Sequence, residues 1–369
     1  MPSSPAHAAS GLKTKIASAF GTPCMVIDMD RVEANIAAAQ ARCDAAGVAN
    51  RPHIKTHKSP LLAHMQLEAG AQGVTCQKLG EAEVMAAAGI TDILIATNLI
   101  GAARAGRLSA LQRQLPLKVC ADNPVTLREY SAAAKAADRP LDVLIECDTG
   151  LERAGVETPA EALALAAQIK ADPWLNFEGL LFYPPLSGWP ATQVFFDRVH
   201  QGLAELGLHP RIVSTGGTPN FANIGQLQGA TEHRAGTCIF NDRMMIAAGM
   251  ATEADCALHV FTTVVSRGGA RRGILDAGSK TLTSDTGGLD GGYGLILEHP
   301  KARIHKFAEE HGFLDLSACP PNAMPEVGEI LRVVPNHVCV VVNMVDELVM
   351  VRGEEIVDVL PVGARGRLV

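Results

Sequence analysis

The sequence lacks the features that define several classes of protein. No stretch reaches the ~18 consecutive apolar residues of a membrane-spanning helix, and the first twenty residues contain no uninterrupted apolar core like that of a signal peptide. No long run of Lys or Arg occurs, and the formal net charge is -7, so a nucleic-acid partner is not expected. These absences predict a cytoplasmic protein, without a membrane partner, that acts on a small molecule.

Cysteine pairs and aromatic residues are also scarce. The nine cysteines include no CxxC pair and are scattered along the chain, unlike the disulfide framework of a small secreted domain. Aromatic residues make up only 4% of the 369 residues, whereas 35 Gly and 21 Pro suit a soluble enzyme with many short turns. The length favours one large α/β domain with a smaller second domain.

Short apolar runs alternate with Ala-rich, helix-like stretches from about residue 24 to residue 240. The runs cover residues 24–28, 52–55, 73–76, 92–97, 117–122, 141–148, 177–183, 211–217 and 236–240. Repeated strand and helix units with near-continuous apolar strands predict a parallel sheet covered by helices, and about eight units favour a (β/α)8 TIM-type barrel. Nine runs are present, so one lies outside the barrel or is not a strand. An open doubly wound sheet is the alternative, but no phosphate loop follows residues 24–28.

The pattern changes after about residue 250 to strands separated by turns. These runs cover residues 257–267, 271–278, 293–299, 302–310, 329–335, 337–342, 347–353 and 355–362. They predict a C-terminal all-β domain. We place the barrel at residues 20–245 and the β domain at residues 246–369, with residues 1–19 as a candidate addition to the β domain.

Lys55 is a candidate catalytic residue because of its position. It ends the run at residues 52–55, where a barrel presents its catalytic face. Burial and neighbouring cations can lower the pKa of such a lysine enough to make its amine a nucleophile. A single lysine at a strand end is more often solvated or structural, and by composition Lys58 would serve equally well.

Several motifs together resemble the D-threonine aldolase and D-serine dehydratase family, whose members have the alanine-racemase-type fold. They are HIKTHK (53–58), GVTCQKLGEAE (73–83), ECDTGLERAG (146–155), STGGTP (214–219), HRAGT (233–237), DAGSKT (276–281) and PNHVC (335–339). The resemblance covers nearly the entire chain. It implies that Lys55 carries pyridoxal 5'-phosphate and that Arg153 contacts the phenolic oxygen of this cofactor. Tyr183 and Gln77 match further residues near the cofactor in that family.

Two Gly-rich turns are candidates for binding the cofactor phosphate. They contain Thr215, Gly216, Gly217 and Thr218 in the first turn, and Gly236 and Thr237 in the second. Glycines let backbone N–H groups approach an anion closely, and hydroxyls add further donors. Such turns often only close barrel loops, but the resemblance implies that these two form the halves of a phosphate cup.

His337 and Cys339 are candidate metal ligands. On a strand their i, i+2 spacing puts both side chains on one face, and imidazole and thiolate suit Zn(II). On spacing alone, a buried cysteine beside a core histidine is an equal alternative. The resemblance implies a divalent metal here, with its identity open among Zn, Mn and Mg.

The resemblance and the predicted metal favour a lyase for D-3-hydroxy amino acids, since a metal beside the cofactor can bind a β-hydroxyl. Loss of the hydroxyl proton to His53, His57 or bound water gives aldol cleavage of a D-threonine-type substrate to glycine and an aldehyde. Removal of the Cα proton by Lys55 instead gives dehydration of D-serine or 3-hydroxy-D-aspartate to a keto acid and ammonia. We predict the aldolase, with the dehydratase as the alternative.

Two further alternatives have less support. A racemase of the alanine racemase type needs a tyrosine base from the C-terminal domain, and Tyr293 is the only tyrosine there. It lies in a Gly-rich segment that matches no motif. A non-catalytic pyridoxal-binding homeostasis protein is typically a barrel alone, which the predicted second domain contradicts. The resemblance also implies a homodimer.

Overall fold

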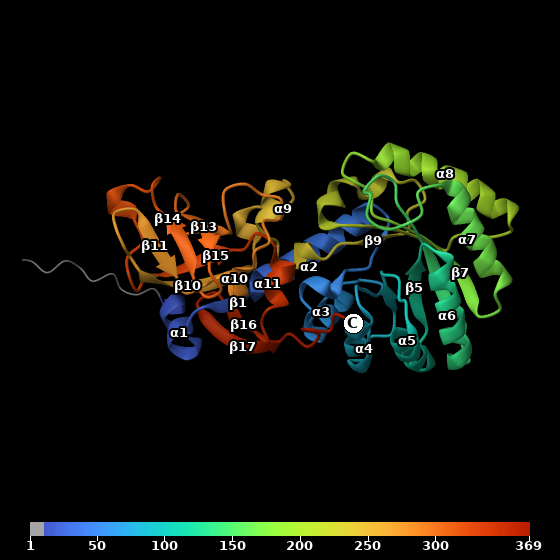
Figure 1. Cartoon of the computed structure of the whole chain (residues 1–369), viewed down its shortest axis with the longest axis horizontal. Coiled ribbons are helices and arrows are strands. Elements are labelled where there is room, and N and C mark those ends of the chain that lie inside the picture. The colour runs from blue at the N-terminus through green and yellow to red at the C-terminus, as the bar shows by residue number, and fades with distance from the viewer. Residues whose placement is uncertain (1–10) are drawn as a thin grey trace, which may run out of the picture. The chain divides into compact units, whose positions relative to one another are not determined.

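The computed structural model describes residues 11–369, which form two compact units (Figure 1). We call residues 36–238 and 366–369 the barrel unit, and the described residues up to 35 together with residues 239–365 the β unit. Within residues 11–369, no helix combines the length and apolar character needed to cross a membrane.

The limits of these units differ from the boundaries expected from the sequence, 20–245 and 246–369. Residues 20–35 and 239–245 belong to the β unit, and the last four residues belong to the barrel unit. Of the candidate N-terminal addition, residues 11–19 belong to the β unit and residues 1–10 lie outside the described part of the chain.

Eight parallel strands form the barrel sheet, in the order β2-β9-β8-β7-β6-β5-β4-β3. They are β2 (Ala49–Asn50), β3 (Val74–Cys76), β4 (Ile93–Ile95), β5 (Leu117–Ala121), β6 (Leu141–Cys147), β7 (Leu175–Phe182), β8 (Ile212–Gly216) and β9 (Glu232–Arg234). A parallel bridge joins His53, which follows β2, to Thr75 in β3. The first and last strands of the sheet therefore meet, and the TIM-type barrel predicted from the sequence is confirmed.

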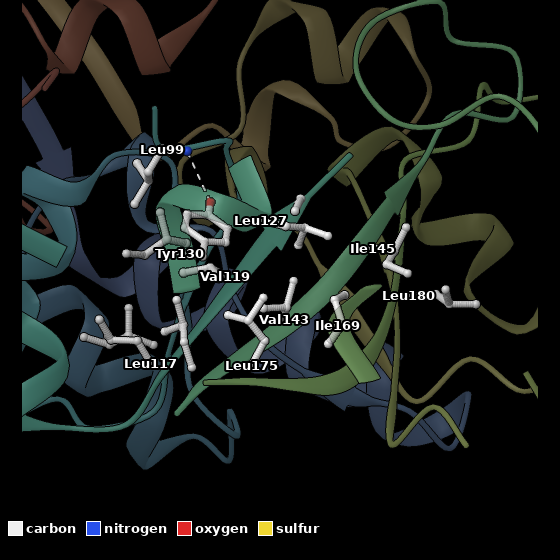
Figure 2. Close-up of a cluster of buried hydrophobic side chains, with 14 of the residues drawn as sticks. Leu99, Leu117, Val119, Leu127, Tyr130, Val143, Ile145, Ile169, Leu175 and Leu180 are labelled. Carbon is white, nitrogen blue, oxygen red and sulfur yellow. Dashed lines mark hydrogen bonds between the residues drawn. The ribbon is translucent and has the colours of Figure 1, made fainter. Parts of the chain in front are cut away.

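Side chains alternate between the two faces of these strands. One buried cluster consists of Leu94, Cys120, Leu144, Leu181 and Ile212. Their strand neighbours, such as Val119 and Val143, belong to a larger cluster that includes Leu127 and Tyr130 of α6 (Figure 2). The smaller cluster fills the barrel interior, and the larger one fills the layer between sheet and helices. Because the period along a strand is two, Glu146 shares the inner face with Leu144, and Tyr183 shares it with Leu181.

Helices cover the outside of the barrel (Figure 1), and all but α2, which begins in the β unit and precedes β2, follow a barrel strand. They are α2 (Met29–Ala45), α3 (Pro60–Glu68), α4 (Leu79–Ala87), α5 (Ala102–Gln114), α6 (Pro124–Ala137), α7 (Pro159–Ala171) and α8 (Trp189–Glu205). The side chains of Ser59, Asn123 and Thr158 cap α3, α6 and α7, and a proline follows each cap. A side-chain acceptor followed by proline starts a helix abruptly. The loop between β5 and α6 is therefore only two residues long, whereas longer loops precede α3 and α7 and carry Lys55 and Arg153.

The β unit contains a nine-stranded mixed sheet. Its main path runs β13-β14-β11-β10-β1-β16-β17, and β15 pairs with β10 and β12. The strands are β1 (Cys24–Asp28), β10 (Leu258–Ser266), β11 (Arg272–Leu275), β12 (Leu295–Ile296), β13 (Arg303–Phe307), β14 (Gly312–Asp315), β15 (Ile330–Val334), β16 (Glu347–Arg352) and β17 (Glu355–Pro361). Ile16 of α1 (Gly11–Phe20) packs with Val26 and Phe261 in one core of this unit. The unit also contains the short helices α9 (Arg243–Ala247), α10 (Ser279–Leu282) and α11 (Val338–Val342).

Four predicted strands differ from the structure. The run at residues 24–28 is β1, which pairs with β10 and β16 in the β unit, so it is the ninth run that does not fit a barrel. Residues 54–56 form the 3-10 helix η1 (Ile54–Thr56), and residues 237–239 form the 3-10 helix η3 (Thr237–Ile239). The valine-rich run at 337–342 contains α11, where the distant Asp242 accepts the N–H of Val338, so a tertiary contact overrides the strand propensity of valine.

Candidate active site

A small pocket is lined by side chains from the C-terminal ends of several barrel strands and from the loops that follow them. Its lining residues are His53, Lys55, Gln77, Ala96, Glu146, Arg153, Leu181, Tyr183 and Arg234. Lys55, His53, Gln77, Arg153 and Tyr183 were all expected at the site from the sequence. The structure therefore brings these five residues together from four different loops, at the face where barrel enzymes carry their chemistry.

Lys55 and Lys58 have different environments, although only two residues lie between them. Lys55 lies on η1 and lines the pocket. Lys58 has a positive φ of 52°, and its Nζ lies 2.8 Å from Oε1 of Glu81 in a buried ion pair. The other oxygen of Glu81 accepts hydrogen bonds from the N–H groups of Gln77 and Lys78 at the start of α4. Lys58 therefore has a structural role in its ion pair with Glu81, and Lys55 is the lysine that lines the pocket.

His53 is engaged through both of its ring nitrogens. Nδ1 accepts a hydrogen bond from the Lys55 N–H at 3.4 Å, and Nε2 lies 3.2 Å from Oε1 of Gln77. Gln77 donates through Nε2 to the carbonyl of Ala96, so its Oε1 is the acceptor and His53 carries its proton on Nε2. Burial first, and then the charge of Lys55, hold the pKa of His53 well below its usual range. His53 is therefore a neutral residue that orients η1 and Gln77.

His57 lies away from the pocket and is fully buried. Its Nδ1 accepts a hydrogen bond from the N–H of Ser59, and its Nε2 lies 3.2 Å from Oε1 of Gln66 on α3. Burial lowers the pKa of His57 to about 4. The structure places this predicted catalytic residue in a structural position at the start of α3.

Arg153 extends into the pocket over an aromatic ring. Its guanidinium carbon lies 4.7 Å from the ring centroid of Tyr183, and its Nη2 lies 3.9 Å from Oε1 of Glu146. Its backbone N–H donates to Asp148, which also accepts from the N–H groups of Gly150 and Leu151. The loop is thus organised around Asp148, and the exposed guanidinium is oriented by Tyr183 and Glu146.

The first Gly-rich turn makes close contacts of its own. Gly217 has a φ of 99°, and a Cβ there would lie 2.8 Å from the ring and the hydroxyl of Tyr183, so only glycine fits. Its N–H donates to the carbonyl of Arg234 at 2.7 Å. The Thr215 hydroxyl is buried against Nδ1 of His233 at 2.9 Å. The Thr215 hydroxyl and the Gly217 N–H therefore already bind His233 and Arg234 of the neighbouring strand β9. Gly216 lies between them at the end of β8.

The second Gly-rich turn lies directly against the lysine segment. A Cβ on Gly236 would lie 2.6 Å from the carbonyl oxygen of His53. Thr218, at the start of the 3-10 helix η2 (Thr218–Gln226), accepts a hydrogen bond from the N–H of Cys238 at 3.1 Å. This contact joins the two turns next to Thr237. Gly236, Thr237 and Thr218 thus lie in a turn pair that can offer donors to an anion near Lys55.

Two charged pocket residues, Arg234 and Glu146, were not among the predicted site residues. Arg234 is buried and donates to the Ser214 hydroxyl at 2.6 Å and to the carbonyl of Phe182 at 3.1 Å. Glu146 accepts from the Cys120 thiol at 3.4 Å, and burial raises its pKa in spite of that contact and the nearby arginines. Glu146 was detectable in the sequence, because it falls on the inward-facing positions of β6 together with Leu144.

The second candidate site lies in the β unit, where His337 precedes α11 and Cys339 lies within it. Oδ2 of the buried Asp242 lies 3.1 Å from Nδ1 of His337 and also accepts the N–H of Val338 at 3.0 Å. Burial opposes protonation of His337, but hydrogen bonds to Asp242 and Cys339 raise its pKa to about 10. The prediction that His337 and Cys339 lie on a strand was wrong. Asp242 accepts the N–H of Val338, the first residue of α11, and this contact supports a helical turn.

This arrangement is compatible with a metal held by few protein ligands. A histidine that binds a metal through one nitrogen usually donates from the other to a carboxylate, and Asp242 occupies that place. Among residues 11–369, no group of three or more His, Cys, Asp or Glu side chains could hold a metal ion. His337 and Cys339 supply two donors, fewer than the four of a closed structural zinc site.

Comparison with known proteins gives matches over both units. The family described as alanine racemase, N-terminal domain, matches residues 27–244, and the family described as putative serine dehydratase domain matches residues 257–351. D-threonine aldolase from Arthrobacter sp. is 35% identical over 361 residues, which cover 94% of this chain and 93% of the relative. D-threo-3-hydroxyaspartate dehydratase from Delftia sp. is 34% identical over 346 residues, with 86% of this chain and 90% of the relative covered.

A solved structure agrees with these sequence matches. D-threonine aldolase from Filomicrobium marinum has a TM-score of 0.85 and 32% identity, and the match covers 94% of this chain and 96% of that one. A barrel alone would not give matches of this extent, which excludes a barrel-only pyridoxal-binding protein. The chain therefore belongs to the alanine-racemase-type family of pyridoxal phosphate enzymes, among the lyases that join an alanine racemase N-terminal domain to a serine dehydratase domain.

Proposed function

We propose that this lyase cleaves D-3-hydroxy amino acids of the D-threonine type to glycine and an aldehyde. Lys55 would carry pyridoxal 5'-phosphate, and His337 and Cys339 would hold a divalent metal. The observation that carries the proposal is the agreement of the sequence relative of 35% identity and the solved structure of TM-score 0.85, both of which are D-threonine aldolases. The pocket around Lys55 supports the proposal, because it brings an amine, an arginine and a tyrosine together.

Bound pyridoxal phosphate accepts the electron pair released at Cα when one bond of the amino acid breaks. Lys55 is the pocket amine available to hold it, since Lys58 is paired with Glu81. Arg153 keeps a permanent positive charge in the same pocket and can direct several N–H donors at an oxygen. Tyr183 and Glu146 hold that guanidinium from two sides.

Two of the residues that the sequence suggested for proton transfer, His53 and His57, are unsuited to it in the structure. His53 and His57 are neutral and each has both ring nitrogens engaged, so neither is free to take a proton from a substrate hydroxyl. Lys55, Tyr183 and Glu146 are the remaining pocket groups that can exchange one. We propose that Lys55 or a bound water takes the proton of the substrate hydroxyl. His53 positions Lys55 by accepting its backbone N–H.

The metal part of the proposal depends on His337, Cys339 and Asp242. A solved D-threo-3-hydroxyaspartate dehydratase structure, 30% identical to this chain with a TM-score of 0.82, is described as a cysteine-to-alanine mutant in the metal-free form. That description fits a cysteine ligand in a relative. Divalent cations supply Lewis acidity towards a hydroxyl oxygen. Asp242 would hold His337 so that Nε2 faces the cation, and Cys339 would add a thiolate.

A dehydratase acting on 3-hydroxy-D-aspartate or D-serine is the second candidate, because the relative from Delftia sp. is a dehydratase at nearly equal identity. Racemisation lacks a matching tyrosine. Tyr293, the candidate from the sequence, packs against the ring of Phe307 with centroids 4.5 Å apart.

One assay distinguishes these reactions. The purified protein is incubated with D-threonine, D-serine and D-threo-3-hydroxyaspartate, and glycine and keto acid are measured separately for each substrate. We expect glycine and acetaldehyde in equal amounts from D-threonine, with no product from L-threonine and none with Lys55→Ala. Keto acid and ammonia without glycine would establish the dehydratase instead. Neither product from any of the three D-amino acids would overturn both candidates.

A further inference from the structure

A Gly-rich segment of the β unit, residues 284–294, has no helix or strand. Five of its glycines have positive φ values, namely Gly287, Gly288, Gly291, Gly292 and Gly294. Such a segment has many accessible backbone conformations, so its order depends on contacts made by other residues. Two side chains from elsewhere in the β unit, those of Asn336 and Arg243, supply such contacts.

Asn336 is buried and uses both ends of its amide on this segment. Its Oδ1 accepts from the N–H of Gly294 at 2.9 Å, and its Nδ2 donates to the carbonyls of Asp285 at 3.3 Å and Gly292 at 3.0 Å. The same Oδ1 accepts from Nη1 of Arg243 at 3.1 Å. All four hydrogen bonds that an asparagine side chain ordinarily forms are therefore made within one network.

Arg243 completes the contact from the other side. Its Nη1 donates to the carbonyl of Gly292 at 3.0 Å, and its Nη2 donates to the carbonyl of Asp290 at 3.0 Å. Arg243 and Asn336 thus reach three carbonyls between residues 285 and 292. Since arginine presents several donors in a fixed plane, the two side chains fix the segment in one conformation.

The two side chains are also neighbours in sequence of the candidate metal site. Asn336 precedes His337, and Arg243 follows Asp242, which holds the His337 ring. The backbones of the two stretches are joined as well, by Arg243 N–H to the carbonyl of Pro335 at 3.1 Å and Met244 N–H to the carbonyl of Asn336 at 3.2 Å. Any movement of segment 284–294 that shifts Asn336 or Arg243 therefore also acts on His337 and Asp242.

We propose that Asn336 and Arg243 are positioning residues for the metal site, through which the order of segment 284–294 and the affinity of His337 and Cys339 for a divalent cation are coupled. The inference rests on the metal site proposed above. Coupling of this kind is reciprocal, so a bound cation also stabilises the segment. The hydrogen bonds that carry the proposal all lie within the β unit, and none depends on the pyridoxal pocket.

The test measures metal affinity directly on the full-length protein after removal of metals. Zn²⁺ is titrated in competition with a chromophoric chelator, for wild type, Asn336→Ala, Arg243→Gln, His337→Ala and the exposed control Asn322→Ala. Loss of a residue that supports a metal ligand typically weakens binding about 10–100-fold. We expect a loss in that range for Asn336→Ala, a smaller loss for Arg243→Gln, and wild-type affinity for Asn322→Ala.

A second measurement addresses the reverse direction of the coupling. Hydrogen exchange of residues 284–294 is followed with and without Zn²⁺ in wild type and in Arg243→Gln, the milder variant. We expect Zn²⁺ to slow exchange in wild type and to slow it less in the variant. Wild-type Zn²⁺ affinity and unchanged Zn²⁺ protection in folded Arg243→Gln would overturn the inference and leave the proposed function intact. Zn²⁺ affinity that survives His337→Ala would overturn the metal site itself, and the inference with it.

Discussion

Lys58 and Glu81 form a buried ion pair in which Nζ and Oε1 lie 2.8 Å apart and the side chains are 5% and 1% exposed. Glu81 also closes the start of α4 by accepting the N–H groups of Gln77 and Lys78. Gln77 in turn contacts His53, whose Nδ1 accepts the N–H of Lys55. The second lysine of the motif thus supports the loop that holds the first one.

The two lysines should therefore respond differently to replacement. Lys55→Ala is expected to remove the visible absorption band of lysine-bound pyridoxal phosphate while leaving the unfolding midpoint nearly unchanged, because this lysine lines a pocket. Lys58→Ala leaves Glu81 buried without its partner, which costs about 3–5 kcal/mol of stability, but the absorption band should remain. Absorption spectra and urea unfolding of both variants check this. Loss of the band only in Lys58→Ala would reverse the assignment.

The barrel was predictable because its signal is carried by local periodicity. The apolar runs at β3 to β8 alternate with helical spacing, and each strand needs only its own residues to be recognised. The failures occur where distant contacts decide. GTCIF at 236–240 reads as a strand, but the last barrel strand is β9, and Gly236 instead packs against the carbonyl of His53. HVCVVV at 337–342 reads as a strand, but Asp242, almost a hundred residues earlier, accepts the N–H of Val338 in α11.

Gly217 offers a test of the contact between the first Gly-rich turn and Tyr183. Its φ of 99° is a region that side-chain-bearing residues avoid, and a Cβ would collide with the Tyr183 ring. Gly217→Ala should cost about 1–3 kcal/mol and, because Arg153 stacks on the displaced ring, should also weaken pyridoxal phosphate binding in a fluorescence titration. Gly89→Ala is the matched control, since Gly89 has a φ of 86° with no atom within 4 Å of its Cβ position. Equal cofactor affinity in the two variants would contradict this prediction.

The site was only partly predictable, for a related reason. Arg153 follows the run at 141–148 and Tyr183 ends the run at 177–183, and the resemblance identified both, whereas Glu146 lies among apolar residues and was read only as part of the run at 141–148. The structural role of His57 was not detectable in the sequence, because it depends on Gln66 and on the turn at Ser59. A motif identifies which residues are near a site, but tertiary contacts decide which of them face the pocket.

His57 predicts a measurable acid sensitivity. Its pKa is about 4 in the folded protein and about 6.5 in an unfolded chain, so the unfolded state binds the proton first as the pH falls. The stability contributed by the neutral ring is complete above pH 6.5 and is lost as the pH decreases towards 4. Linkage gives a loss of about 2 kcal/mol between pH 7 and pH 5. Urea unfolding across that range should show a smaller loss for His57→Gln than for wild type. The exposed His209→Gln should behave like wild type, and an unchanged pH dependence in His57→Gln would disprove the assignment.

Asp242 predicts how the metal site responds to the loss of one charge. Its carboxylate accepts from His337 and Val338 through Oδ2 and from Met245 through Oδ1. Asp242→Asn keeps one acceptor oxygen but removes the charge that orients and polarises the imidazole. We expect Zn²⁺ affinity to fall about 10–100-fold, measured by chelator competition. The thermal unfolding of the metal-free protein should change far less, because the asparagine oxygen can still cap a helix.

Asp346→Asn is the control for this prediction, since Asp346 pairs with Arg365 at an exposed position of the β unit. Equal Zn²⁺ affinity in Asp242→Asn and Asp346→Asn would mean that Asp242 serves only to cap α9 and α11.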